Sequence, residues 1–128
     1  MTRQMGRKHA LGVLILLAAL MMAGQTEAKE QLPSVPSELR AGEGKFNANC
    51  ARCHGERGIG SKQGPPLVHK IYKPNHHGDA AFLRAAAVGV RAHHWNFGDM
   101  PKVEGVTSAD VEQIIKYIRW LQRQAGIN

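Results

Sequence analysis

Three residues close together, Cys50, Cys53 and His54, carry the clearest chemical signal in the sequence. A Cys-x-x-Cys-His run is the attachment signature of c-type haem. The two thiols add to the two vinyl groups of the haem and form thioethers, and the histidine can give an imidazole nitrogen to the iron. The run therefore predicts one covalent haem c, held through Cys50 and Cys53, with His54 as an iron ligand.

Three other chemistries fit this cysteine pair less well. A thioredoxin-type redox pair would need a βαβ context, which the sequence does not indicate. A zinc site would need further ligands at fixed spacing, and the chain has only two cysteines. A disulfide could close so short a loop, but it would leave His54 without a role.

Met100 is the second candidate iron ligand. The other four methionines all lie within the first 22 residues, so Met100 is the only thioether in the remaining chain. Pro101 follows it directly, lacks a backbone donor and stiffens the loop. A thioether fixed in this way is a good axial ligand for haem iron, so His54 and Met100 together are the predicted metal ligands.

Two histidine pairs, His76–His77 and His93–His94, each allow two interpretations. Adjacent histidines can bind metals, but polar loops contain such pairs more often, and we favour the loop interpretation for the first pair. In the second pair, either histidine competes with Met100 as an iron ligand. Coordination by two histidines would lower the reduction potential.

Three helices are expected to position these residues, and the first covers residues 38–51. Ser37 is a plausible N-cap. Phe46 lies on the apolar face of this helix, and Gly42 lies on the same face four residues earlier. A glycine usually costs stability within a helix but is tolerated where another backbone approaches closely, so we expect the last helix to cross here.

The other two helices are expected over residues 79–90 and after Thr107. Asp79 suits the first turn of its helix. The Thr107-x-x-Asp110 spacing resembles a capping box, with Asp in place of Glu. Trp120 lies away from the apolar stripe, so we expect it either to pack against the leader or to contact a partner. The stripe of the last helix recurs at helical spacing and consists of Val111, Ile114, Ile115, Ile118 and Leu121.

Together these features resemble the class I, mono-haem cytochrome c family, in its small bacterial periplasmic form. The resemblance covers about residues 41–124 and implies an all-α cytochrome c fold, with three main helices and loops wrapped around one covalent haem. It is carried by Gly42-x-x-x-Phe46-x-x-x-Cys50-x-x-Cys53-His54-Gly55, by Gly64-Pro65-Pro66-Leu67, by Asp99-Met100-Pro101 and by a final helix with Tyr117.

The resemblance also implies haem contacts for Pro65, Leu67 and Trp95. The carbonyl of Pro65, eleven residues after His54, would accept the imidazole N–H. Leu67 would pack on the macrocycle, and Trp95 would donate its indole N–H to a haem propionate. The alternative for Trp95 is a core residue bonded to a backbone carbonyl. We further expect the backbone of the glycine-rich segment 55–64 to pass close to a haem edge.

Residues 1–28 are predicted to be a cleavable secretory signal peptide, which implies a periplasmic protein. They combine a basic start with an apolar run that ends in small residues. This run is short for a membrane span, which needs about 20 apolar residues. Residues 29–37 are expected to form an extended leader, and residues 38–128 the cytochrome c domain, without a membrane span.

The charge of the mature chain points to protein partners. The signal peptide holds three of the 17 basic and one of the 10 acidic residues, so the rest carries a net charge of +5. Because these charges are scattered among acids, nucleic acid is a poor candidate. A redox donor and acceptor with an acidic docking face fits better, although the charge could also serve solubility alone.

We therefore expect a one-electron carrier rather than an enzyme. With His54 and Met100 in both axial positions, no iron site would be left for a substrate or dioxygen. One alternative is a haem subunit of a periplasmic dehydrogenase. Another is a haem enzyme or gas-binding protein in which Met100 can be displaced.

Overall fold

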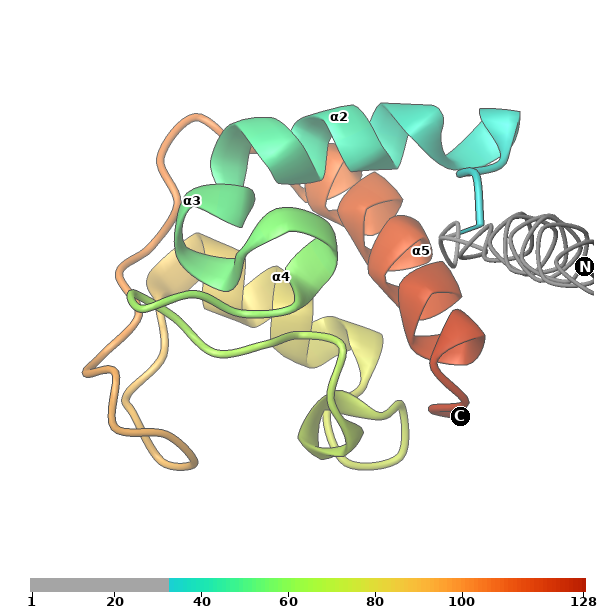
Figure 1. Ribbon diagram of the computed structural model, residues 1–128. Helices are drawn as coiled ribbons and strands as arrows, with labels where there is room; N and C mark the ends of the chain where they lie inside the picture. Colours follow the sequence, from blue (N-terminus) through green and yellow to red (C-terminus); the bar gives the residue numbers. More distant parts are fainter. Residues whose placement is uncertain (1–32) are drawn as a thin grey trace, which may run out of the picture. The chain divides into compact units, whose positions relative to one another are not determined.

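Four α-helices and three short 3-10 turns make up the described part of the chain, residues 33–128 of a computed structural model (Figure 1). Within this part no helix is both long and apolar enough to cross a membrane. The predicted signal peptide and residues 29–32 of the predicted leader lie outside the described residues. The elements are η1 (Ser37–Leu39), α2 (Arg40–Asn49), α3 (Ala51–His54), η2 (Glu56–Gly58), η3 (Lys70–Tyr72), α4 (Asp79–Val88) and α5 (Ser108–Gln124).

The last helix begins as predicted and the first does not. Thr107 and Asp110 form a reciprocal capping box at α5, with backbone-to-side-chain bonds of 3.0 and 3.2 Å. Ser37, by contrast, caps no helix, because a 3-10 turn precedes α2 and its hydroxyl donates to the neighbouring Glu38. The predicted helix 38–51 is also divided, since it is interrupted at Cys50, which has a φ of −119°, and continues as α3.

Helices α2 and α5 cross at Gly42, which is buried (Figure 1). A Cβ atom on Gly42 would overlap the backbone oxygen of Gln113 and lie 3.2 Å from the Cβ of Tyr117. One turn further on, the rings of Phe46 and Tyr117 pack with centroids 5.7 Å apart. The predicted crossing at Gly42 and Phe46 is thus confirmed, but the residues that meet Gly42 lie outside the predicted apolar stripe.

Gly42→Ala should destabilise the protein, because the added methyl group meets backbone rather than a movable side chain. Overpacking of this kind costs about 1–3 kcal/mol. Gly44→Ala is the matched control in the same helix, since its Cβ would meet nothing within 4 Å. Removing an exposed helical glycine should stabilise by about 0.5–1 kcal/mol. Denaturant unfolding of the two variants should give changes of opposite sign, and a neutral Gly42→Ala would contradict the close crossing.

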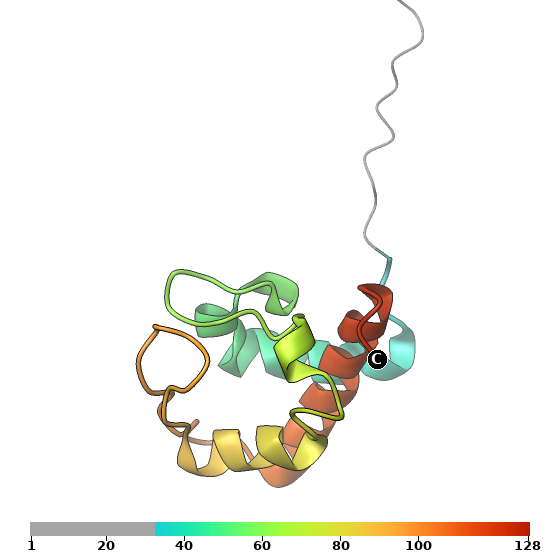
Figure 2. The same cartoon turned by 90° about the horizontal axis from the view of Figure 1, so that it is seen from below.

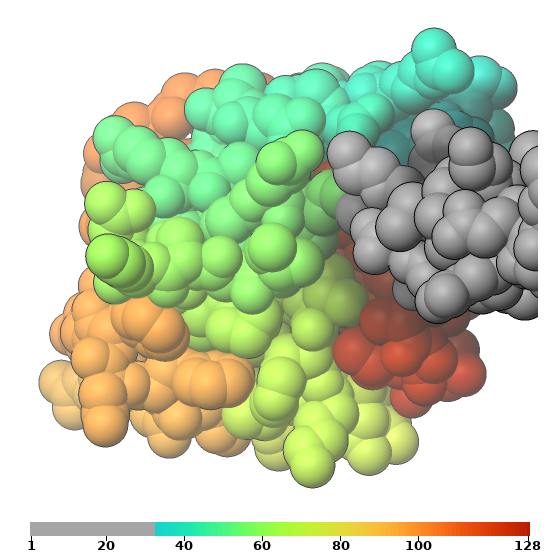
Figure 3. Space-filling view, in the orientation of Figure 1, coloured from blue at the N-terminus to red at the C-terminus, as the bar shows by residue number. Residues whose placement is uncertain are grey.

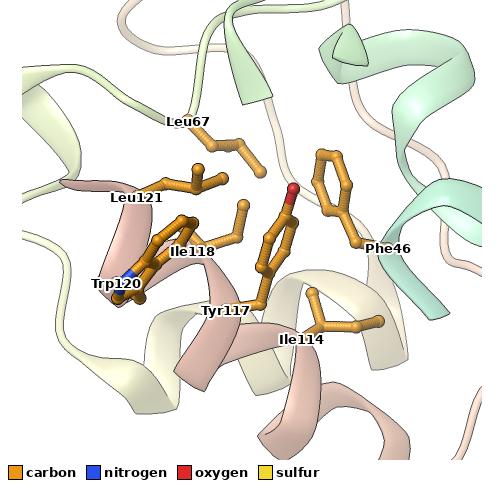
Figure 4. Packing of buried hydrophobic residues seen from close by; sticks show 7 residues of the cluster. All are labelled: Phe46, Leu67, Ile114, Tyr117, Ile118, Trp120 and Leu121. Carbon is orange, nitrogen blue, oxygen red and sulfur yellow. The ribbon is translucent and has the colours of Figure 1, made fainter. Parts of the chain in front are cut away.

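The main apolar core lies between α2, α5 and the segment around Leu67 (Figure 4). Trp120 belongs to it, with only 8% of its surface exposed, and its ring stacks 6.3 Å from that of Tyr117. Trp120 is therefore a core residue and not an exposed partner contact, while the leader residue Val35 packs against the cluster as a whole. The cluster comprises Phe46, Leu67, Ile114, Tyr117, Ile118, Trp120 and Leu121.

A buried polar network joins α5 to the loop that precedes α4. Arg119, only 8% exposed, donates to the carboxylate of Asp79 at 2.9 Å and to the backbone oxygens of Tyr72 and His77, both at 2.6 Å. Its guanidinium also donates to Gln122, whose amide reaches the Tyr72 oxygen at 3.1 Å. From the sequence, Arg119 is expected only to stabilise its helix as a basic residue near the C-terminal end. In the structure this residue instead fixes the loop and the start of α4.

Candidate functional site

One cavity of about 870 Å³ brings together all seven residues that the sequence singles out as haem contacts. Its size is within the range of cofactor sites. The cavity is lined by α2–α3, α4, the start of α5 and the loops between them, all of which can be followed in Figure 2. The seven residues are Cys50, Cys53, His54, Pro65, Leu67, Trp95 and Met100.

His54 ends the short helix α3 and is buried, with 8% of its surface exposed. Its Nδ1 lies 2.8 Å from the Pro65 carbonyl oxygen. A carbonyl can only accept, so Nδ1 carries the proton and Nε2 keeps its lone pair. Burial lowers the pKa of His54, while the bond to Pro65 acts in the opposite direction. The side chain is therefore a neutral imidazole with a fixed orientation, which is the form that binds a metal.

Cys50 and Cys53 open onto the same cavity and are not joined by a disulfide. The break between α2 and α3 falls at Cys50 and lets both cysteines and His54 line one cavity within five residues. Burial, together with the neighbouring Cys53, raises the pKa of the Cys50 thiol to about 11. A thiol with this pKa is protonated and uncharged at neutral pH. The thioether that forms from it is also uncharged, so the site holds no buried charge before or after attachment.

The glycine-rich segment 55–64 supports α3 from outside the cavity. The amide of Gly60 donates to the backbone oxygen of His54 at 2.7 Å. A Cβ atom on Gly64 would lie 2.8 Å from the backbone oxygen of Cys53. None of the four glycines of this segment lines the cavity. The close approach that these glycines allow is to the cysteine–histidine run itself.

The loop that presents Met100 is closed by backbone hydrogen bonds. The amide and carbonyl of Val90 pair with those of Met100, both at 2.9 Å. Asp99 accepts from the amide of Ala92 at 2.8 Å. Gly89 has a φ of +82°, and its missing Cβ would lie 2.5 Å from the Met100 oxygen. Sequence reasoning missed Gly89 and Val90, although a glycine that ends a helix in the left-handed region is a usable signal.

Trp95 contributes the best evidence that a polar group of a ligand belongs in the cavity. Its indole Nε1 is buried and makes no hydrogen bond of standard geometry with the described residues. A weaker hydrogen-bonding interaction joins it to the phenol of Tyr72, whose pKa is raised by burial and lowered in part by Trp95. A buried indole N–H wants an acceptor. The backbone carbonyl of the alternative interpretation is not found, whereas a haem propionate would supply such an acceptor.

The chain matches the family described as Cytochrome c over residues 39–122. It therefore belongs to the cytochrome c family and is a haem c electron-transfer protein with the all-α fold of that family. Haem c is attached covalently, and Cys50 and Cys53 stand at the required spacing. The comparison with curated proteins gave no match, and neither did the comparison with solved structures.

Proposed function

We propose that this cytochrome c carries single electrons between redox proteins in the periplasm, with His54 and Met100 as its axial iron ligands. The observation that carries the proposal is that both residues line the cavity onto which Cys50 and Cys53 open. The haem supplies the one-electron chemistry, by cycling between ferric and ferrous iron. The predicted signal peptide over residues 1–28 supports export.

The side chains of this chain would hold the iron in one coordination state. The Pro65 carbonyl fixes the ring of His54 so that Nε2 is the free donor. The Val90–Met100 bridge holds the thioether loop from its backbone. With both axial positions filled, the iron would offer no place for a substrate. A neutral thioether and a buried site favour the ferrous form, so we expect a positive reduction potential.

The cavity rim supports a partner with an acidic docking face. Four exposed basic side chains line the cavity, against one acidic side chain, Glu104, which pairs with Lys102 at 2.8 Å. Positive charge at this place would steer an acidic partner to the redox centre. Electron exchange with such a partner should slow as ionic strength rises. The four basic residues are Arg52, Arg84, Arg91 and Lys102.

The holoprotein itself tests the proposal. A carrier should show a reversible one-electron titration at positive potential and a low-spin spectrum in both oxidation states. The reduced protein should resist carbon monoxide, because no axial position is open. Rapid carbon monoxide binding by the unmodified protein would overturn the carrier proposal in favour of a sensor or an enzyme.

A further inference from the structure

Four histidines gather beside the cavity from loops on either side of α4. His76 and His77 precede this helix, and His93 and His94 follow it. In Figure 3 the loop after α4, in orange, lies against the yellow-green loop before it. One ring nitrogen from each of His76, His77 and His94 lies within 4.8 Å of the other two. The ring of His93 stacks on that of His77 with centroids 5.9 Å apart, and its centroid lies 4.3 Å from that of His94.

Backbone hydrogen bonds orient two of these rings. Nδ1 of His77 donates to the Ile71 oxygen at 2.8 Å, and Nδ1 of His93 donates to the Arg91 oxygen at 2.8 Å. In each ring the proton is thereby placed on Nδ1, and Nε2 keeps its lone pair. Histidines that bind metals almost always donate their other ring nitrogen in this way. The two rings are therefore prepared for a ligand role.

The loop that carries His77 is itself held in place. The buried guanidinium of Arg119 donates to the His77 backbone oxygen at 2.6 Å. The same guanidinium also bonds Asp79 two residues later and Tyr72 five residues earlier. A binding site is more precise when its support is rigid. The histidine cluster, which consists of His76, His77, His93 and His94, is thus carried by two loops. One is fixed by Arg119, and the other is the hydrogen-bonded loop of Met100.

We propose that His76, His77 and His94 bind a divalent transition-metal ion at a site separate from the haem iron. Imidazole nitrogen suits Zn²⁺, Cu²⁺ and Ni²⁺, whereas Ca²⁺ and Mg²⁺ need oxygen ligands, which this group does not provide. Three protein ligands leave one position of a tetrahedral site open for water or for an exogenous ligand. His93 adjoins the site and is available as a fourth ligand.

The electrostatics of the cluster agree with this role. Desolvation and the neighbouring imidazoles of His93, His77 and His76 lower the pKa of the exposed His94. This shift favours the neutral form of His94, which is the form that a metal requires. Because His77, His93 and His94 also line the haem cavity, the competing role is hydrogen bonding to a haem propionate.

Calorimetric titration of the full-length oxidised holoprotein with Zn²⁺ tests the proposal. We expect one ion per protein and an unchanged low-spin haem spectrum. Loss of a ligand's hydrogen-bond partner alone costs about 10–100-fold in metal affinity, so His77→Ala and His94→Ala should each weaken binding at least that much. His94 is exposed, so its variant should fold even if that of His77 does not.

The matched control is His69→Asn, which removes a histidine outside the cluster. The Nδ1 of His69 accepts from the Ile71 amide at 3.2 Å, and an asparagine oxygen can do the same. This variant should bind Zn²⁺ like the unmodified protein. Equal Zn²⁺ affinity in the His94→Ala variant and the unmodified protein would overturn the metal site and leave the carrier proposal intact. Loss of the low-spin spectrum in His94→Ala would identify His94 as an iron ligand, and would overturn both the metal site and the assignment of Met100 as the second axial ligand.

Discussion

Replacing both Cys50 and Cys53 by serine should leave a largely unfolded chain when the protein is purified without haem. The reason is that many apolar side chains of the protein face the cofactor cavity rather than one another. Helix α4 contains no fully buried residue of its own, and five of its residues line the cavity. Without haem the apolar residues that line this cavity of about 870 Å³ lose their main packing partner. Small domains are stable by only about 5–15 kcal/mol, so a loss of this kind is a large share of the total.

Circular dichroism and thermal unfolding measure this effect directly. The double variant should lose most of its helical signal and its cooperative transition, as small proteins do when a structural cofactor is removed. Cys50→Ser alone is the control, because one thioether at Cys53 can still hold the haem in its cavity. That variant should keep native helix content with a lower melting temperature. Native helicity and a cooperative transition in the double variant would show that the protein core suffices without haem.

The sequence was a good guide wherever a feature depends on neighbours along the chain. The attachment run is local, because thioethers and imidazole come from residues 50–54. The capping box at Thr107 and the 3.6-residue period after it place α5 within a residue of its observed start. Gly42 predicted the helix crossing, because a glycine on the apolar face of a helix is tolerated where another backbone approaches closely. The contact of His54 with the Pro65 carbonyl was expected from family resemblance rather than from any local rule.

Features that depend on distant segments were missed. Nothing local distinguishes Arg119 from an exposed basic residue at a helix end, since its partners at Tyr72 and Asp79 lie at least 40 residues away. Nor do the two histidine pairs, taken separately, indicate that the chain brings them together on either side of α4. Hydrophobic periodicity indicates which face of a helix is buried, but it does not indicate which polar side chains are buried together with that face.

Met100→Ala should leave one axial position of the haem iron open to exogenous ligands. If the Met100 thioether binds the iron, the unmodified ferric protein has a weak long-wavelength iron–sulfur charge-transfer band, and the variant lacks it. The reduced variant should bind carbon monoxide rapidly, because one axial position becomes free. The fold should persist, since the bridge to Val90 uses only the backbone of Met100. Absorption spectra with and without carbon monoxide measure the change.

The choice of substitute separates loss of a ligand from a change of ligand. Met100→His should keep the iron low-spin and resistant to carbon monoxide, yet lower the reduction potential, because imidazole favours ferric iron more than a thioether does. Axial ligands tune haem potentials over about 0.8 V, so a decrease on the order of 100 mV is expected. His93→Ala and His94→Ala should leave the charge-transfer band in place. If one of these loses the low-spin spectrum while Met100→Ala retains it, the second ligand is a histidine, and the potential of the unmodified protein should then already be low.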